Sequence, residues 1–162
     1  MLMRILGETL IGVGIALLLR RFLFLLVWVK GNSMRETLRS GEILFALRRK
    51  LHPGLKRFDV VICRYPGRKQ HFVKRIVALP NESIAVEEGI LLINGSPVAE
   101  PFPLRKSNRN LSERLLGDHS YFVMGDNRPV SRDSRSVGPI QDEAIEAVVK
   151  CILWPPRRIQ RI

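Results

Sequence analysis

The chain reads Asp59-Val-Val-Ile-Cys-Arg64 and then, past a turn at Pro66-Gly67, His71-Phe-Val-Lys-Arg-Ile-Val-Ala-Leu79. Both runs are short and rich in β-branched residues, and a turn pair separates them, which is the pattern of two consecutive strands. Few segments of the chain carry a long helical period. The sequence therefore predicts a mainly β domain.

Short apolar runs alternate with turn residues along the rest of the chain from residue 41 onward. Residues 101–120 are polar and aperiodic, which predicts a loop or flap. Glu88-Gly89 has the composition of a hairpin turn, and Asn94-Gly95 that of a tight turn. Further strands are predicted at Glu42–Leu47, Ser83–Glu87, Ile90–Ile93, Tyr121–Met124 and Ala144–Leu153, the last of which can begin as a helical turn.

The first 21 residues predict a membrane anchor. A spanning helix needs about 20 residues, and Ile5–Leu19 alone is shorter. Arg20 and Arg21 can extend the span by reaching to the interface. A cleavable signal peptide is the main alternative, but bulky residues rather than small ones follow the apolar core. Residues 22–29 predict a strand, so the chain divides into an anchor (1–21) and a folded domain (22–162).

The orientation of this anchor is ambiguous by charge alone. Arg4 lies on one side of it, whereas Arg20, Arg21 and Lys30 lie on the other. The positive-inside rule, applied to these four charges, would keep the large domain in the cytoplasm.

The chain is basic, with a formal net charge of +12. Beyond residue 21 there are 24 basic and 14 acidic residues, so +10 belongs to the domain. Such a charge favours nucleic acid or anionic headgroups as partners, although a solvated basic surface explains it equally well. Cys63 and Cys151 lie in apolar runs, which favours free thiols over a disulfide. No group of His, Cys and Asp has metal-ligand spacing.

Two segments contain residues that suit acyl transfer. Ser33 follows Gly31-Asn32 directly after the predicted strand 22–29, where an exposed turn can offer both a hydroxyl and a free backbone N–H. Lys74 shares a strand face with apolar residues at 72, 76 and 78. Desolvation there would lower its pKa and leave a neutral amine that can accept a proton. An ordinary turn serine and a lysine that reaches to water remain the alternatives.

A third segment is Gly125-Asp-Asn-Arg-Pro-Val-Ser-Arg-Asp-Ser-Arg-Ser-Val-Gly138. Asp133 and Arg135 can pair, and so can Asp126 with a nearby arginine, which would fix the loop in one geometry. An ordinary polar turn is the alternative reading.

In this order the three segments resemble those of bacterial signal peptidase I. That family has Gly-x-Ser-Met-x-Pro-Thr-Leu, a Lys-Arg pair leading to Leu-Pro-Gly, and Gly-Asp-Asn-Arg-x-x-Ser-x-Asp-Ser-Arg-x-x-Gly. They correspond here to Gly31–Leu38, Lys74–Asn81 and Gly125–Gly138, and the third matches at every fixed position. The resemblance covers essentially the whole chain and implies a compact antiparallel β-domain with an N-terminal transmembrane helix.

The resemblance also implies roles for individual residues. Ser33 would be the nucleophile, with its backbone N–H holding the oxyanion, and Lys74 the general base. Ser131 matches the serine that hydrogen-bonds and orients this lysine. The other supporting positions are the salt bridge of Asp133 with Arg135, and the structural residues Asp126 and Arg75.

The chain departs from the family pattern at three positions. Glu36 replaces proline, which predicts a freer loop and a raised pKa of Lys74. Asn81 replaces glycine, a mild change because Asn tolerates left-handed backbone. Gly31 stands where some members have an additional hydroxyl donor to the oxyanion. None of these changes removes a catalytic group.

The implied activity is a serine endopeptidase that cleaves exported preproteins after small residues and needs no cofactor or metal. The implied location is the cytoplasmic membrane, with a single span, the active site outside and anionic lipids as further partners. No nucleic acid is expected. Two alternatives remain: a self-cleaving Ser-Lys regulator, which would need a helix-turn-helix module in place of the apolar anchor, and a non-catalytic membrane-surface protein, for which Glu36 would mark lost activity.

Overall fold

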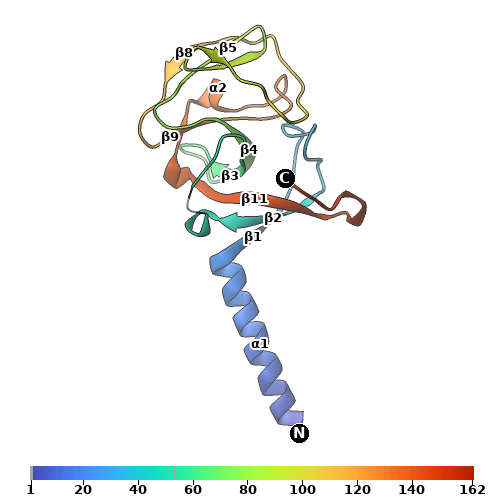
Figure 1. The fold of residues 1–162 in the computed structure, drawn as a ribbon. Coiled ribbons are helices and arrows are strands. Elements are labelled where there is room, and N and C mark those ends of the chain that lie inside the picture. The colour runs from blue at the N-terminus through green and yellow to red at the C-terminus, as the bar shows by residue number, and fades with distance from the viewer. Residues whose placement is uncertain (1, 53) are drawn as a thin grey trace.

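The computed structural model describes residues 2–52 and 54–162, which form an N-terminal helix followed by two β-sheets (Figure 1). The helix α1 spans Leu2–Leu23, and a short helix α2 spans Ser134–Val137. The strands are β1 (Phe24–Trp28), β2 (Ile43–Arg48), β3 (Val60–Arg64), β4 (His71–Ala78), β5 (Ser83–Glu87), β6 (Ile90–Ile93), β7 (Ser96–Pro97), β8 (Leu111–Leu115), β9 (Ser120–Met124), β10 (Ile140–Gln141), β11 (Ile145–Trp154) and β12 (Gln160–Arg161). Single 3₁₀ turns lie at Arg49–Leu51, Asp142–Ala144 and Pro156–Arg158.

The larger sheet has the order β1-β2-β11-β3-β4-β9-β10, with β12 paired to β11. The smaller sheet has the order β7-β6-β5-β8. Every pairing between these strands is antiparallel. The predicted mainly β, antiparallel architecture is therefore confirmed. A 3₁₀ turn at Asp142–Ala144 precedes β11, where the sequence allowed a helical turn at the start of the strand.

The placement of β11 joins the two ends of the domain. This C-terminal strand lies between β2 and β3 and pairs with both. It thereby connects the N-terminal strands β1 and β2 to the central strands of the sheet. β4 lies further along the same sheet, between β3 and β9. The sheet therefore brings the β1–β2 connection, β4 and the loop after β9 into one region.

Helix α1 projects from the β-domain, with the N-terminus at its far end (Figure 1). Its apolar side chains at positions 5, 6, 10, 11 and 13 are exposed. The helix continues to Leu23, so the prediction that the strand begins at residue 22 is wrong by two residues; the helix runs through the Arg20-Arg21 pair. By length and hydropathy, none of the helices within residues 2–52 and 54–162 qualifies as a membrane span.

The predicted loop at residues 101–120 contains a strand that the sequence did not indicate. β8 pairs with β5 at the edge of the smaller sheet. Its side chains are exposed apart from the half-buried Leu111, so the strand has no apolar alternation to reveal it. The backbone pairing with β5, rather than burial of its own side chains, accounts for this strand.

Three apolar clusters form the core. One contains Met34 and Leu38 together with residues of β2, β3 and β11. The second lies between the smaller sheet and the end of β4, and the third lies on β3, β4, β9 and β11. Both cysteines are free as predicted: Cys63 is buried, whereas Cys151 is only half-buried. The strand β4, which carries Lys74 and Arg75, is therefore packed against apolar clusters on both of its faces.

Candidate active site

Ser33 lies in a tight turn that begins directly after β1. The Arg35 N–H donates to the Asn32 carbonyl at 3.2 Å, and the Leu38 N–H donates to the Met34 carbonyl at 2.6 Å. Met34 and Leu38 are 2% and 0% exposed, so the turn is fixed to the core on its inner side. This anchoring leaves the half-buried Ser33 facing the groove described below.

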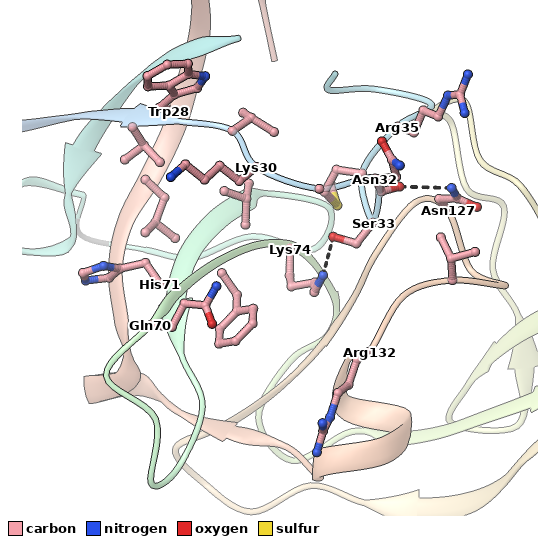
Figure 2. Close-up of a pocket in the computed structure, with 18 of the residues that line it drawn as sticks. Trp28, Lys30, Asn32, Ser33, Arg35, Gln70, His71, Lys74, Asn127 and Arg132 are labelled. Atoms are coloured by element: carbon pink, nitrogen blue, oxygen red, sulfur yellow. Dashed lines mark hydrogen bonds between the residues drawn. The ribbon is translucent and has the colours of Figure 1, made fainter. Parts of the chain in front are cut away.

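Lys74 comes from the middle of β4, and the structure brings it to Ser33. Its Nζ lies 2.6 Å from Ser33 Oγ, within hydrogen-bond distance (Figure 2). The side chain is 2% exposed, although lysine is rarely buried in this way without an ionic partner. A lysine placed at a serine hydroxyl and away from water is the geometry of a base and its nucleophile.

The environment of Lys74 lowers its pKa from the ordinary value of a lysine. Burial is the largest cause, because it disfavours the charged ammonium. The negative charge of Asp133, the Cys63 thiol and Asp126 act in the opposite direction, and Arg135 adds to the lowering. The amine is thus shifted toward its neutral form.

Asp126 and Arg75 form a buried ion pair behind the serine turn. Arg75 Nε donates to Asp126 Oδ1 at 2.9 Å, and Arg75 Nη2 donates to Asp126 Oδ2 at 2.7 Å. Asp126 is 0% exposed. The Thr37 hydroxyl, from the end of the serine turn, donates to the same carboxylate and accepts from Arg75. This bidentate pair therefore ties β4, the loop after β9 and the serine turn together.

The guanidinium of Arg75 is also covered from outside. Its Cζ lies 3.9 Å from the centre of the Phe102 ring, a cation–π contact, and Phe102 in turn packs edge-on against Phe58. The segment around Phe102 is held down by an ion pair between Glu100 and Arg128.

Asp133 and Arg135 form the second ion pair predicted from the sequence. Arg135 Nε and Nη2 donate to the two carboxylate oxygens of Asp133, each at 2.9 Å. The carboxylate also accepts the Arg135 backbone N–H, which caps α2, and the Gly125 N–H at 3.0 Å. Burial opposes the ionised form, but the Arg135 contacts outweigh it and hold the pKa of Asp133 below its usual value.

Ser131 lies at the site, but the predicted hydrogen bond to Lys74 is not formed. Its Oγ is buried near the Asp133 carboxylate, where it helps to lower the pKa of that group, yet within the described part of the chain it makes no hydrogen bond of ordinary geometry. Lys74 instead bonds Ser33.

The absence of a side chain at Gly125 allows the serine turn to lie close to the loop that carries Ser131. A Cβ atom added there would lie 2.3 Å from Ser131 Oγ and 2.4 Å from the Ser33 carbonyl oxygen. Neither distance is sterically possible, and the second involves backbone, so a side chain at this position would displace the serine turn.

Replacing Gly125 by alanine is expected to lower both the free energy of unfolding, by about 1–3 kcal/mol as for an overpacked core, and kcat. Denaturant unfolding and steady-state kinetics measure the two effects. Gly117→Ala is the matched control, since its added Cβ would make only an ordinary contact, 3.6 Å from Ser120 Oγ. Equal stability and equal kcat in the two variants would contradict the close approach.

Asn127 has a structural role that the sequence did not reveal. Its backbone N–H donates to the Ser33 carbonyl and its Nδ2 to the Asn32 carbonyl, both at 3.0 Å (Figure 2). The residue thereby fixes both peptide units around Ser33. Its place between Asp126 and Arg128 in the third motif was a signal, but nothing in the pattern indicated what the amide would bind.

The structure accommodates the three residues that depart from the family pattern, Glu36, Asn81 and Gly31. Glu36 is exposed, and the charges that act most strongly on Lys74 do not include it, so the predicted rise in the pKa of Lys74 from Glu36 is not found. Asn81 has a φ of +64°, as expected for an Asn that replaces glycine. Gly31 has a φ of +92°, a conformation that side chains rarely adopt, which suits glycine at the start of the serine turn.

Ser33 and Lys74 line a groove with a volume of about 930 Å³. Much of its wall is apolar and comes from β1, β3 and β4, and polar residues form the rest. The apolar part of the wall consists of Leu25, Leu26, Val27, Trp28, Val29, Ile62, Phe72 and Val73, with Met34 and Val130 nearby. An extended peptide can therefore lie across the serine with small apolar side chains against this wall.

Comparison with known proteins places the chain in a family. Residues 2–154 match the family described as signal peptidase, peptidase S26. Signal peptidase I T of Bacillus subtilis (strain 168) is 40% identical over 157 residues, which cover 90% of this chain and 81% of that protein. Signal peptidase I of Bacillus licheniformis is 36% identical over 163 residues, covering 93% and 88%.

A solved structure supports the same assignment. The crystal structure of a signal peptidase I from Enterococcus faecalis V583 superposes with a TM-score of 0.50 at 27% identity, covering 59% of this chain and 96% of that one. The chain therefore belongs to the signal peptidase family, peptidase S26, and is a peptidase of the signal peptidase I type.

Proposed function

We propose that this chain removes signal peptides from exported preproteins, with Ser33 as the nucleophile and Lys74 as its general base. The observation that carries the proposal is the 2.6 Å contact between Lys74 Nζ and Ser33 Oγ, made by a lysine that is 2% exposed. Burial lowers the pKa of this amine, so a larger fraction of it is neutral and able to accept a proton than in an exposed lysine.

In the first half of the reaction, Ser33 Oγ attacks the carbonyl carbon of the scissile peptide, and its proton passes to neutral Lys74. The resulting ammonium then protonates the leaving amine as the C–N bond breaks, so the lysine is neutral again. In the second half, Lys74 takes a proton from water, which attacks the acyl-enzyme ester, and the proton returns to Ser33 Oγ. No step requires a metal or a cofactor.

The backbone N–H of Ser33 is the proposed donor to the oxyanion. The carbonyl of the same peptide unit, that of Asn32, accepts from Asn127 Nδ2 and from the Arg35 N–H. Because the N–H and C=O of a trans peptide point in opposite directions, the Ser33 N–H is turned away from Asn127. Such preorganised donors are a large part of acyl-transfer catalysis.

The two ion pairs are proposed to position this dyad. Asp126 and Arg75 hold the serine turn against β4 through Thr37. Asp133 and Arg135 fix the loop from Gly125, and Arg135 also lowers the pKa of Lys74. For Ser131 we propose the role of orienting the lysine during the reaction, since its hydroxyl is buried at the site, near the Asp133 carboxylate.

We also propose that residues 1–21 anchor the domain of residues 22–162 to the cytoplasmic membrane in a single pass, with the active site on the extracytoplasmic side. The exposed apolar side chains of α1, and its projection from the domain, support this role (Figure 1). Exposed apolar residues of β1 and β11, Leu26, Trp28 and Trp154 among them, would contact the bilayer. The basic charge would favour anionic lipids.

Cleavage of a model preprotein by the full chain in non-ionic detergent tests this function. The wild type is expected to cut after a small residue, whereas Ser33→Ala is expected to show no cleavage because the attacking oxygen is gone. Ser40→Ala, which removes an exposed hydroxyl seven residues away, is the control and should cut normally. Circular dichroism confirms that each variant is folded. Cleavage by Ser33→Ala at the wild-type rate would overturn the assignment.

A further inference from the structure

Three arginines line the same groove as Ser33 and Lys74 without a charged partner. They are Arg35, Arg105 and Arg132, called the arginine cluster below. All three are exposed. Among residues 2–52 and 54–162, no carboxylate forms an ion pair with any of them. Most of the arginines that hold the fold together, by contrast, contact a carboxylate, so these three charges are available to a ligand.

The groove offers little negative charge to compensate the cluster. Of the described residues that line it, Glu146 is the single carboxylate. Glu146 is already bound, at 2.6 Å to Arg64 Nε and at 3.0 Å to His71 Nε2. The electrostatic potential of the groove near Ser33 is therefore positive, a condition that attracts anionic groups on a bound peptide.

Two members of the arginine cluster, Arg35 and Arg105, lie next to Asn127. Figure 2 shows Arg35 beside Asn127 on one side of Ser33, whereas Trp28 and His71 lie on the opposite side. Arg105 pairs with Asn127 in a β-bridge, and its N–H donates to the Asp126 carbonyl. Arg132 also lines the groove, but Figure 2 shows it well apart from Arg35, with its guanidinium directed away from Ser33.

The apolar wall contributed by β1 lies on the Trp28 side. If the proposed function holds, the small residues before the cleaved bond occupy this wall. The residues after the bond then leave the groove past Asn127, toward Arg35 and Arg105, and Arg132 lies elsewhere along the groove.

We propose that the arginine cluster is a specificity element for the mature side of the substrate, selecting preproteins with acidic side chains a few residues after the cleavage site. Guanidinium groups bind carboxylates with matched geometry. A lipid headgroup is the competing ligand for exposed arginines. The peptide is favoured because all three arginines line the groove of Ser33.

The experiment compares two fluorogenic peptides that share a small-residue cleavage site and differ only at the second and third positions after the cut, which carry Glu-Glu or Gln-Gln. The full chain is assayed in non-ionic detergent at low and high salt. We expect kcat/KM for the Glu peptide to be about three- to tenfold higher at low salt, through KM, since exposed ion pairs are individually weak. This ratio should fall toward one at high salt.

Arg105→Gln/Arg132→Gln is the test variant, and Arg157→Gln/Arg161→Gln, which loses the same charge outside the groove, is the control. The ratio should fall below about twofold in the first and persist in the second. The proposal would be overturned if the wild type cleaved both peptides equally well, or if the test variant kept the wild-type preference for the Glu peptide. It would also be overturned if the preference appeared only when anionic vesicles replaced the detergent. Each of these outcomes leaves the proposed function intact. Failure of the wild type to cleave either peptide would overturn both.

Discussion

Replacing Lys74 by methionine is expected to lower kcat/KM for preprotein cleavage by about 10³-fold or more. General-base assistance contributes about 10²–10⁴-fold, and Ser33 has no other base within hydrogen-bond reach among the described residues. Methionine has a similar length, so the groove keeps its shape. Because the substitution also removes a buried amine, the free energy of unfolding at neutral pH should stay the same or rise.

Lys69→Met is the matched control, since Lys69 is exposed and lies only five residues away. It should retain wild-type kcat/KM. The kinetic measurement is paired with a thermal melt, so that loss of activity is separated from loss of fold. Near-normal cleavage by a folded Lys74→Met protein would exclude the lysine as the base.

Replacing Asp126 by alanine is expected to lower the free energy of unfolding by about 3–5 kcal/mol, because it leaves Arg75 buried without its counter-ion. This is a large share of the roughly 5–15 kcal/mol that stabilises a typical domain. Thr37 loses its acceptor at the same time, so the serine turn loosens. Denaturant unfolding measures the loss.

Two comparisons make this result specific to the ion pair. Asp118→Ala removes an exposed carboxylate and should change stability little. Adding Arg75→Met to Asp126→Ala should restore part of the lost stability, since no charge then remains buried and unpaired. If Asp126→Ala unfolded at the same denaturant concentration as Asp118→Ala, the pair would not be a structural tie.

The strands that the sequence predicted well are those whose side chains are buried. β3, β5 and β6 have the expected ends within one residue, because burial requires the β-branched and apolar runs visible in the sequence. β8 was missed because backbone pairing alone defines it. The end of α1 was misplaced because an apolar run such as 22–29 suits a helix or a strand equally well, and the site of the switch depends on the pairing of β1 with β2.

The site was predictable as a set of residue types but not as a network. Strand alternation predicted that Lys74 shares an apolar face with residues 72, 76 and 78. The pairing of β4 with β9 is irregular between Ile76 and Ala78, and Ala78 packs in a different apolar cluster from Ile76. Resemblance to a family indicated Ser33, Asp126 and Asp133. The bonds of Asn127 to the serine turn depend on how distant loops meet, and no local pattern encodes that.

The pH dependence of kcat/KM tests the role of Lys74 as a neutral base most directly. The rate should rise as this amine loses its proton. Because burial lowers the pKa of Lys74, the rise should occur below the ordinary lysine pKa of about 10.4. With a peptide substrate that has no titrating group, an ascending limb in this lower range agrees with the proposed dyad. A rate that does not change with pH, or that rises only near the pKa of a free lysine, would contradict it.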